Sequence, residues 1–115
     1  MRDLAELKLR LREFVAARDW DRFHSPKNLA MALSVEASEL VELFQWLTEE
    51  ESAALDGDRR QRVAAELADV LWYLVRIADR LDIDLLQAAE LKLGQNAKKY
   101  PAEQVRGQAQ KYDEY

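Results

Sequence analysis

Apolar side chains recur at steps of three and four residues along most of this sequence, and this spacing constrains the fold more than any other feature. The period places the apolar residues along one side of an α-helix, whereas a strand would need strict alternation. Three glycines and two prolines among 115 residues leave few helix breakers. Most other positions carry residues that favour helix, above all Ala, Leu, Glu, Arg and Lys. The sequence therefore predicts an all-α fold.

Four long helices account for this periodicity. The expected helices span residues 4–18, 26–47, 59–81 and 85–100. Asp3, Ser25 and Asp58 precede the first three and are residue types that favour the N-cap. Pro101 ends the fourth, because proline cannot continue a helix.

The connections between these helices are short and polar. We expect residues 19–25 to be non-helical, and Thr48 to Glu51 to open one short turn through a capping box. Asp56-Gly57-Asp58 and Asp82-Ile83-Asp84 break the chain before the third and fourth helices. Short links favour antiparallel neighbours, so we expect an antiparallel four-helix bundle formed by one domain, residues 1–101. Residues 102–115 are predicted to be a polar C-terminal tail, disordered or lying on a partner.

The third helix is apolar on nearly all sides. Its main stripe consists of Val63, Leu67, Val70, Leu74, Ile77 and Leu81. Trp72 and Val75 fall on the opposite side at about 100° per residue. A helix of this kind is normally buried all round, and a bundle of this size cannot surround it. We therefore predict a homo-oligomer, a dimer or a tetramer.

Charge and composition exclude several classes of function. The net charge of −5 argues against binding nucleic-acid polymers, which relies on clustered Lys and Arg. The absence of cysteine removes disulfides, thiolate zinc sites and thiol nucleophiles, and one histidine cannot build a multi-histidine metal site. No apolar run is long enough for a membrane span or a secretory leader. We expect a cytoplasmic protein without a membrane partner.

Two pairs of carboxylates stand out from the many acids of a solvated helical surface. Glu36 occupies a step of the Leu29, Leu33, Leu40, Leu43, Leu47 stripe where an apolar residue belongs. Glu39 follows one turn later on the same flank. Glu66 and Asp69 repeat this spacing on the third helix. An isolated buried carboxylate costs several kcal/mol unless it is neutralised, paired or bound to a metal.

Four carboxylates on neighbouring antiparallel helices can converge into one cluster. Like-charge repulsion makes such a cluster unstable unless divalent cations occupy it. Oxygen ligands without His or Cys favour Mg²⁺ or Mn²⁺. A ferritin-like di-iron site would require two Glu-x-x-His pairs, and neither pair contains histidine. The alternative is that all four are ordinary surface acids.

These acids and their neighbours resemble a known signature. Glu36-Ala-Ser-Glu39, followed after 26 residues by Glu66-Leu-Ala-Asp69, is similar to the motif of the all-α nucleoside triphosphate pyrophosphohydrolases, the MazG-like superfamily. Within that superfamily the chain resembles the dCTP pyrophosphatase branch from Arg18 to Pro101. That similarity is carried by Arg18-Asp19-Trp20, Phe23-His24, Asn28-Leu29, Glu42-Leu43-Phe44-Gln45-Trp46, Tyr73-Leu74-Val75 and Tyr100-Pro101.

The resemblance implies Mg²⁺-dependent cleavage of a nucleoside triphosphate to the monophosphate and pyrophosphate, with dCTP or a modified dCTP as substrate. It implies that Glu36, Glu39, Glu66 and Asp69 are the catalytic metal ligands. The positions matching an aromatic base pocket are Trp20, His24, Trp46 and Tyr73. Trp46 follows Glu39 by seven residues, so we expect the two on one helix face. The positions matching phosphate and sugar contacts are Lys92, Asn96, Lys99 and Tyr100.

One segment departs from the family pattern, because an arginine-rich run in relatives reads Asn96-Ala97-Lys98-Lys99-Tyr100 here. Lys is a monodentate partner of phosphate where Arg is bidentate, so weaker phosphate affinity is expected. Two alternatives to the dCTP hypothesis stay open. One is a broader pyrophosphohydrolase, or one that prefers dUTP or damaged nucleotides. The other is a non-catalytic helical oligomerisation or regulatory module, in which the acids are solvated.

Overall fold

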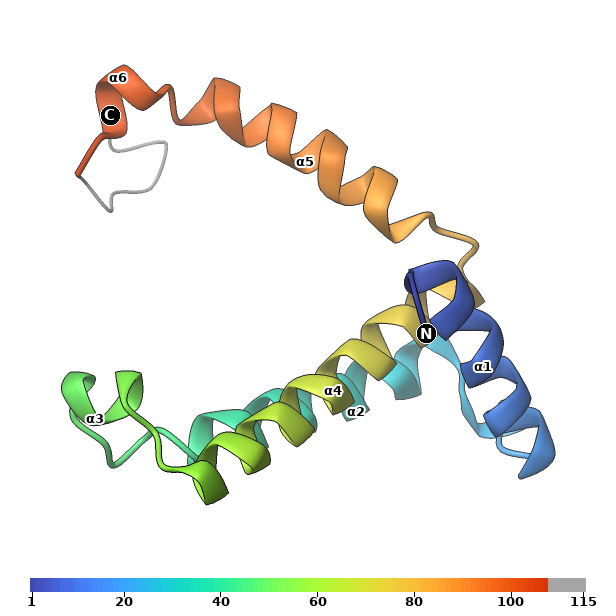
Figure 1. Cartoon of the computed structure of the whole chain (residues 1–115). Coiled ribbons are helices and arrows are strands. Elements are labelled where there is room, and N and C mark those ends of the chain that lie inside the picture. The colour runs from blue at the N-terminus through green and yellow to red at the C-terminus, as the bar shows by residue number, and fades with distance from the viewer. Residues whose placement is uncertain (108–115) are drawn as a thin grey trace. The chain divides into compact units, whose positions relative to one another are not determined.

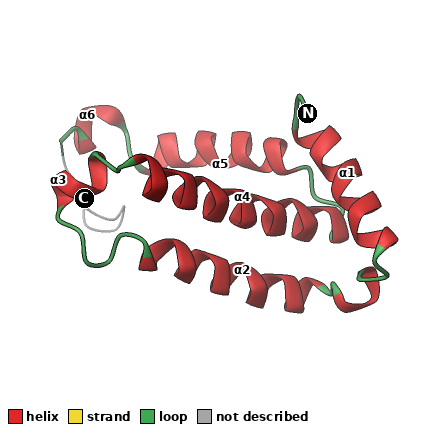
Figure 2. Cartoon of the chain, turned by 60° about the horizontal axis from the view of Figure 1, so that its bottom comes forward, coloured by secondary structure: helices red, strands yellow, loops and turns green. Residues whose placement is uncertain are grey.

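The computed structural model describes residues 1–107, and within that range the chain is helical with no strand, which confirms the all-α fold. The elements are α1 (Leu4–Ala17), η1 (Asp21–Phe23), α2 (Pro26–Glu42), α3 (Glu49–Ala53), α4 (Gly57–Arg80), α5 (Leu85–Lys99) and α6 (Ala102–Val105) (Figures 1 and 2). None of these helices is long and apolar enough to cross a membrane.

The chain divides into two units, residues 1–82 and residues 83–115. The first contains α1 to α4. The second contains α5 and α6, so the segment expected to be a tail begins with a short helix. The rest of that tail, residues 108–115, lies outside the described residues. The single domain of residues 1–101 and the four-helix bundle stay predictions.

Local hydrogen bonds explain where most helices begin. The side chains of Asp3 and Ser25 accept the backbone N–H of Glu6 and Asn28 and cap α1 and α2, as the sequence predicts. The reciprocal capping box of Thr48 and Glu51 is likewise confirmed at α3. These caps satisfy N–H groups that the first helical turn leaves without intrahelical partners.

The start of α4 differs from the prediction, because the N-cap is Asp56 and not Asp58. The backbone of Asp56 is extended, and its carboxylate accepts the N–H of Arg59 at 2.8 Å. Asp58 already lies in the first turn of α4, where its negative charge interacts favourably with the positive end of the helix dipole. The expectation for residues 19–25 was also incomplete, since Asp21–Phe23 form one 3₁₀ turn.

The end of α2 is the largest departure. The sequence predicts a helix to Trp46 or Leu47, whereas α2 ends at Glu42. Arg59 of α4 donates to the Leu43 carbonyl at 2.7 Å. A continuing helix would pair that carbonyl with the N–H of Leu47, which bonds to Phe44 instead. A side chain from another helix has therefore replaced the backbone partner.

The first unit is built on two neighbouring helices. α2 and α4 run antiparallel side by side, and α1 packs against the C-terminal part of α4 (Figures 1 and 2). The buried apolar side chains of the described residues are Leu7, Leu11, Val15, Leu29, Val75 and Ala78. Leu67, Leu74 and Leu81 are exposed within the chain, so the expected α4 stripe is wrong at alternate members. Glu66 and Tyr73 are half-buried in their place.

Replacement of Leu29 by alanine tests this core. Leu29 is 1% exposed, so Leu29→Ala should lower the free energy of unfolding by about 2–5 kcal/mol through lost burial and the cavity left behind. Urea denaturation followed by circular dichroism measures the loss. The matched control Leu9→Ala, at a position 52% exposed, should cost less than about 1 kcal/mol. Equal losses would contradict the packing described.

Candidate metal and nucleotide site

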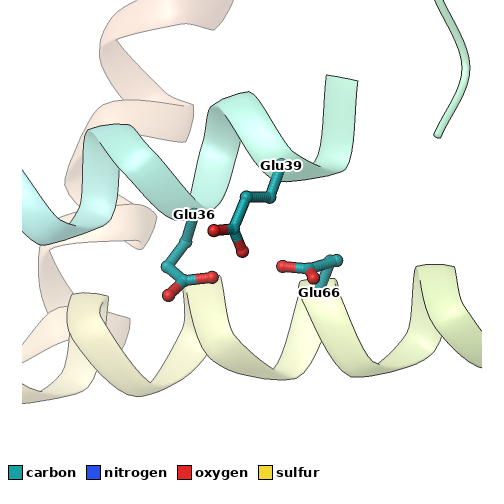
Figure 3. Close-up of side chains that lie close together, drawn as sticks. All are labelled: Glu36, Glu39 and Glu66. Atoms are coloured by element: carbon teal, nitrogen blue, oxygen red, sulfur yellow. The ribbon is translucent and has the colours of Figure 1, made fainter. Parts of the chain in front are cut away.

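Three glutamates from two helices meet between α2 and α4. Glu36 and Glu39 lie one turn apart on α2, and Glu66 extends toward them from α4 (Figure 3). One carboxylate oxygen from each lies within 4.8 Å of the others. Spacing of this kind allows one cation to contact all three residues.

The cluster is electrostatically unfavourable without a cation. Burial and, after it, the neighbouring carboxylates of Glu39 and Asp69 together raise the pKa of Glu36 to about 7. Burial also raises the pKa of Glu66, followed by the charge of Glu39. Among residues 1–107, the buried Oε2 atoms of Glu36 and Glu66 have no hydrogen-bond partner. Lone pairs in that condition are available to a metal ion.

Asp69 and Tyr73 lie beside this cluster without belonging to it. Asp69 is not among the residues whose carboxylate oxygens meet within 4.8 Å. Its charge nevertheless raises the pKa values of Glu36, Glu66 and Tyr73. Burial raises the pKa of Tyr73, and the charges of Glu36 and Asp69 raise it further. The structure thus brings three of the four expected ligands together and keeps the fourth within electrostatic reach.

Comparison with known proteins identifies the family. The sequence profile of the MazG-like family matches residues 31–115. The chain belongs to the MazG-like family. It is 47% identical over 102 residues to dCTP pyrophosphatase 1 of Bos taurus and 46% identical over 104 residues to that of Homo sapiens. These matches confirm the resemblance to the dCTP pyrophosphatase branch.

The matches cover most of this MazG-like chain but only part of the relatives. They include 87% and 89% of the chain, and 60% and 61% of the bovine and human proteins. The chain therefore spans about three fifths of the length of these curated relatives. A solved structure of a pyrophosphatase from Archaeoglobus fulgidus superposes with a TM-score of 0.80 at 41% identity, covering 84% of this chain and 91% of that one.

The aromatic positions inferred from the MazG-like resemblance do not meet within one chain. Trp20 and His24 precede the start of α2, whereas Trp46 follows its end and is 87% exposed. A helix of 17 residues is about 25 Å long. One nucleobase cannot contact both tryptophans of a single chain. The expectation that Trp46 shares a helix face with Glu39 is wrong, because α2 ends before Trp46.

The expected phosphate and sugar contacts belong to the second unit. Lys92, Asn96 and Lys99 recur along α5 at steps of four and three, which places them on one side of that helix. Tyr100 is the C-cap, and its N–H donates to the Asn96 carbonyl at 2.8 Å. Their role toward a nucleotide stays a prediction.

A second charged cluster was not anticipated from the sequence. Arg76 is 4% exposed and forms ion pairs with Asp21 and Asp79. Its signal was present, because a charged residue stands between Val75 and Ile77 on a helix that is apolar nearly all round. Asp79 lies three residues later on the same helix, whereas the pairing with Asp21 depends on the packing of η1 on α4, which helical periodicity does not encode.

The carboxylate cluster predicts a pH-dependent stability that a metal removes. Because the pKa of Glu36 is about 7 in the folded protein and about 4.5 ordinarily, the metal-free protein should lose stability as pH rises from 5 to 8. Mg²⁺ or Mn²⁺ should raise the Tm, more at pH 8 than at pH 5, because the cation binds the ionised carboxylates.

The Glu36→Gln variant tests whether the carboxylate of Glu36 causes this dependence of the Tm on pH and metal. Removing one repelled charge should raise the metal-free Tm at pH 8 by about 5 °C and abolish most of the metal-induced shift. Glu49→Gln, at an exposed position of α3, should behave as the unsubstituted protein. A Tm profile in metal-free buffer that Glu36→Gln leaves unchanged would refute the clustered-carboxylate description.

Proposed function

We propose that this chain is a Mg²⁺-dependent nucleoside triphosphate pyrophosphohydrolase that converts dCTP or a modified dCTP to the monophosphate and pyrophosphate. The observation that carries the proposal is the meeting of the Glu36, Glu39 and Glu66 oxygens within 4.8 Å, with two buried oxygens left unpartnered among the described residues. Relatives that are about 46% identical and named dCTP pyrophosphatase 1 support the substrate, and the similarity to the pyrophosphatase from Archaeoglobus fulgidus supports the type of reaction.

The donor set fits a hard divalent cation. Glu36, Glu39 and Glu66 would hold Mg²⁺, with Asp69 beside them, and Mn²⁺ is an alternative because it accepts the same oxygen ligands. When bound, the cation supplies charge neutralisation for the phosphates and makes water more acidic. The carboxylates hold and orient that charge between two packed helices, so little reorganisation is needed on reaction.

The reaction needs no nucleophilic side chain. One water adds across the anhydride between the α and β phosphates, and the broken P–O bond yields the monophosphate and pyrophosphate. Around this reaction we assign base contacts to Trp20, His24, Trp46 and Tyr73. We assign phosphate and sugar contacts to Lys92, Asn96, Lys99 and Tyr100. A role of this kind in the nucleotide pool would place the protein in the cytoplasm, without a nucleic-acid polymer or a membrane as partner.

The subunit is proposed to be an antiparallel four-helix bundle that assembles into a homo-oligomer. Exposed apolar side chains on α2 and α4 support this assembly; they are Met31, Val35, Leu67, Leu71 and Trp72. The separation of Trp20 and Trp46 by the length of α2 also supports it, since a base that contacts both must take them from different copies.

Product analysis tests the chemistry. Phosphorus NMR after incubation with Mg²⁺ and a panel of nucleoside triphosphates, including 5-methyl-dCTP, should show monophosphate and pyrophosphate, formed fastest from deoxycytidine nucleotides. Glu39→Gln should lower kcat by more than about 100-fold, because even the outer partners of a metal site cost 10–100-fold when lost. Glu42→Gln, exposed one turn later on α2, is the matched control and should retain activity.

The other outcomes separate the competing functions. Faster turnover of dUTP or of damaged nucleotides would keep the chemistry and discard the dCTP preference. An inert panel, together with a Tm insensitive to Mg²⁺, would favour the non-catalytic oligomerisation or regulatory module.

Complementation between variants tests the shared base pocket. Multi-angle light scattering should give a mass that is a multiple of 13.4 kDa. Trp20→Ala and Trp46→Ala should each raise KM, and a co-refolded mixture of the two should recover up to about a quarter of the intact sites if each pocket takes one tryptophan from each copy. A monomeric mass, or no recovery in a mixture shown to form mixed oligomers, would contradict the shared pocket.

A further inference from the structure

Two arginines of α4 hold the short connector between α1 and α2. Asp21 of η1 accepts from Nη2 of Arg76 at 3.0 Å, and its other oxygen accepts from Nη1 of Arg80 at 3.3 Å. These residues are 55 and 59 positions apart in the sequence. The contact therefore ties the connector, residues 19–25, to a helix that forms the carboxylate cluster.

Arg76, which binds Asp21, is itself held in place by further ion pairs. Arg76 is buried and also pairs with Asp79, whose carboxylate is bound in a bidentate manner by Arg12 of α1. The hydrogen bond from Arg12 lowers the pKa of Asp79, so this carboxylate stays ionised. A buried guanidinium without partners is costly, which favours this one arrangement of α1, η1 and α4.

Asp21 stands between two residues assigned to the nucleobase. Trp20 precedes it and packs edge-to-face on Phe14, with ring centroids 5.8 Å apart. His24 follows and is half-buried, and its Nδ1 has no hydrogen-bond partner among residues 1–107. Burial lowers the pKa of His24, as does the charge of Arg76, whereas Asp21 raises it. The ring of His24 thus lies within electrostatic range of the same network that holds Asp21.

We infer that Asp21 is a positioning residue which, clamped by Arg76 and Arg80, holds Trp20 and His24 in the arrangement that receives the nucleobase. This inference rests on the proposed function for the identity of the ligand. A connector ordered in advance avoids the entropy cost of fixing it on binding, so the clamp acts on affinity. Glu36, Glu39 and Glu66 take no part in the ion pairs of Asp21, so turnover is separate from the clamp.

If the ion pairs of Asp21 only stabilised the fold, their loss would lower the Tm and leave substrate affinity unchanged. Asp21 is 58% exposed, and pairs of that exposure contribute little to stability. Loss of the Asp21 carboxylate still leaves Arg76 paired with Asp79, so the fold should survive. A large effect on substrate affinity with a small effect on Tm distinguishes positioning from stabilisation.

Three substitutions test the inference in the whole chain of 115 residues. Asp21→Asn removes the negative charge and one of the two acceptor oxygens that the arginines bind, and Asp21→Glu retains a carboxylate. The matched control, Asp19→Asn, removes an exposed ion pair with Arg22 in the same connector, at a left-handed backbone position that asparagine tolerates. Each is measured for KM and kcat with dCTP, and for the NMR titration of His24, which is the single histidine of the sequence.

The expected result is specific in direction. Asp21→Asn should raise KM about tenfold while kcat changes less than about twofold. The pKa of His24 should rise toward its ordinary value, because release from the network ends the burial that lowers it. Loss of the Asp21 charge in an unchanged structure would lower that pKa instead. Asp21→Glu and Asp19→Asn should resemble the unsubstituted protein.

Other results would overturn the positioning role of Asp21, and they can be told apart from a failure of the proposed function. A His24 pKa that stays the same or falls in Asp21→Asn shows that no clamp was released. A raised pKa with unchanged KM refutes the positioning role. If the unsubstituted protein hydrolyses no nucleotide, the proposed function fails, and the assignment to the nucleobase fails with it, whereas the His24 titration still decides the clamp.

Discussion

Electrostatic repulsion among three carboxylates is the constraint on which the first unit depends. Glu36, Glu39 and Glu66 occupy the interface of α2 and α4, where apolar side chains would pack more favourably. The raised pKa of Glu36 expresses that cost in the metal-free chain. An arrangement that is unfavourable by itself and favourable with a cation is typical of a binding site, because the free energy of cation binding offsets the stability lost by bringing the carboxylates together.

The same unit contains buried charge of a different kind. Arg12, Arg76 and Arg80 pair with Asp21 and Asp79, so each charge in this network has an oppositely charged partner without any ligand. The glutamate cluster has no cationic side chain among its described contacts. The contrast separates two uses of charge in the first unit. The neutralised network orders α1, η1 and α4, while the uncompensated cluster is left for a ligand.

The sequence predicted helices better than helix ends. Caps that depend on residues three positions apart, such as Ser25 with Asn28, were confirmed because the interaction is local. The predicted end of α2 was wrong because the side chain of Arg59 donates a hydrogen bond to the carbonyl of Leu43, sixteen residues away along the chain. The candidate ligands were predicted through their spacing on two helices, whereas the pairing of Arg76 with Asp21 was missed because Asp21 belongs to η1, 55 residues away along the chain.

The sequence by itself determined the all-α class, the family and the two acidic motifs, because each depends on residue type and local spacing. Only the tertiary structure decided that three of the four acids meet, and that α2 ends before Trp46, where Arg59 of α4 donates to the Leu43 carbonyl. Helical periodicity specifies which side of one helix a residue occupies. It does not specify the register and approach of two helices, which are set by packing between distant segments.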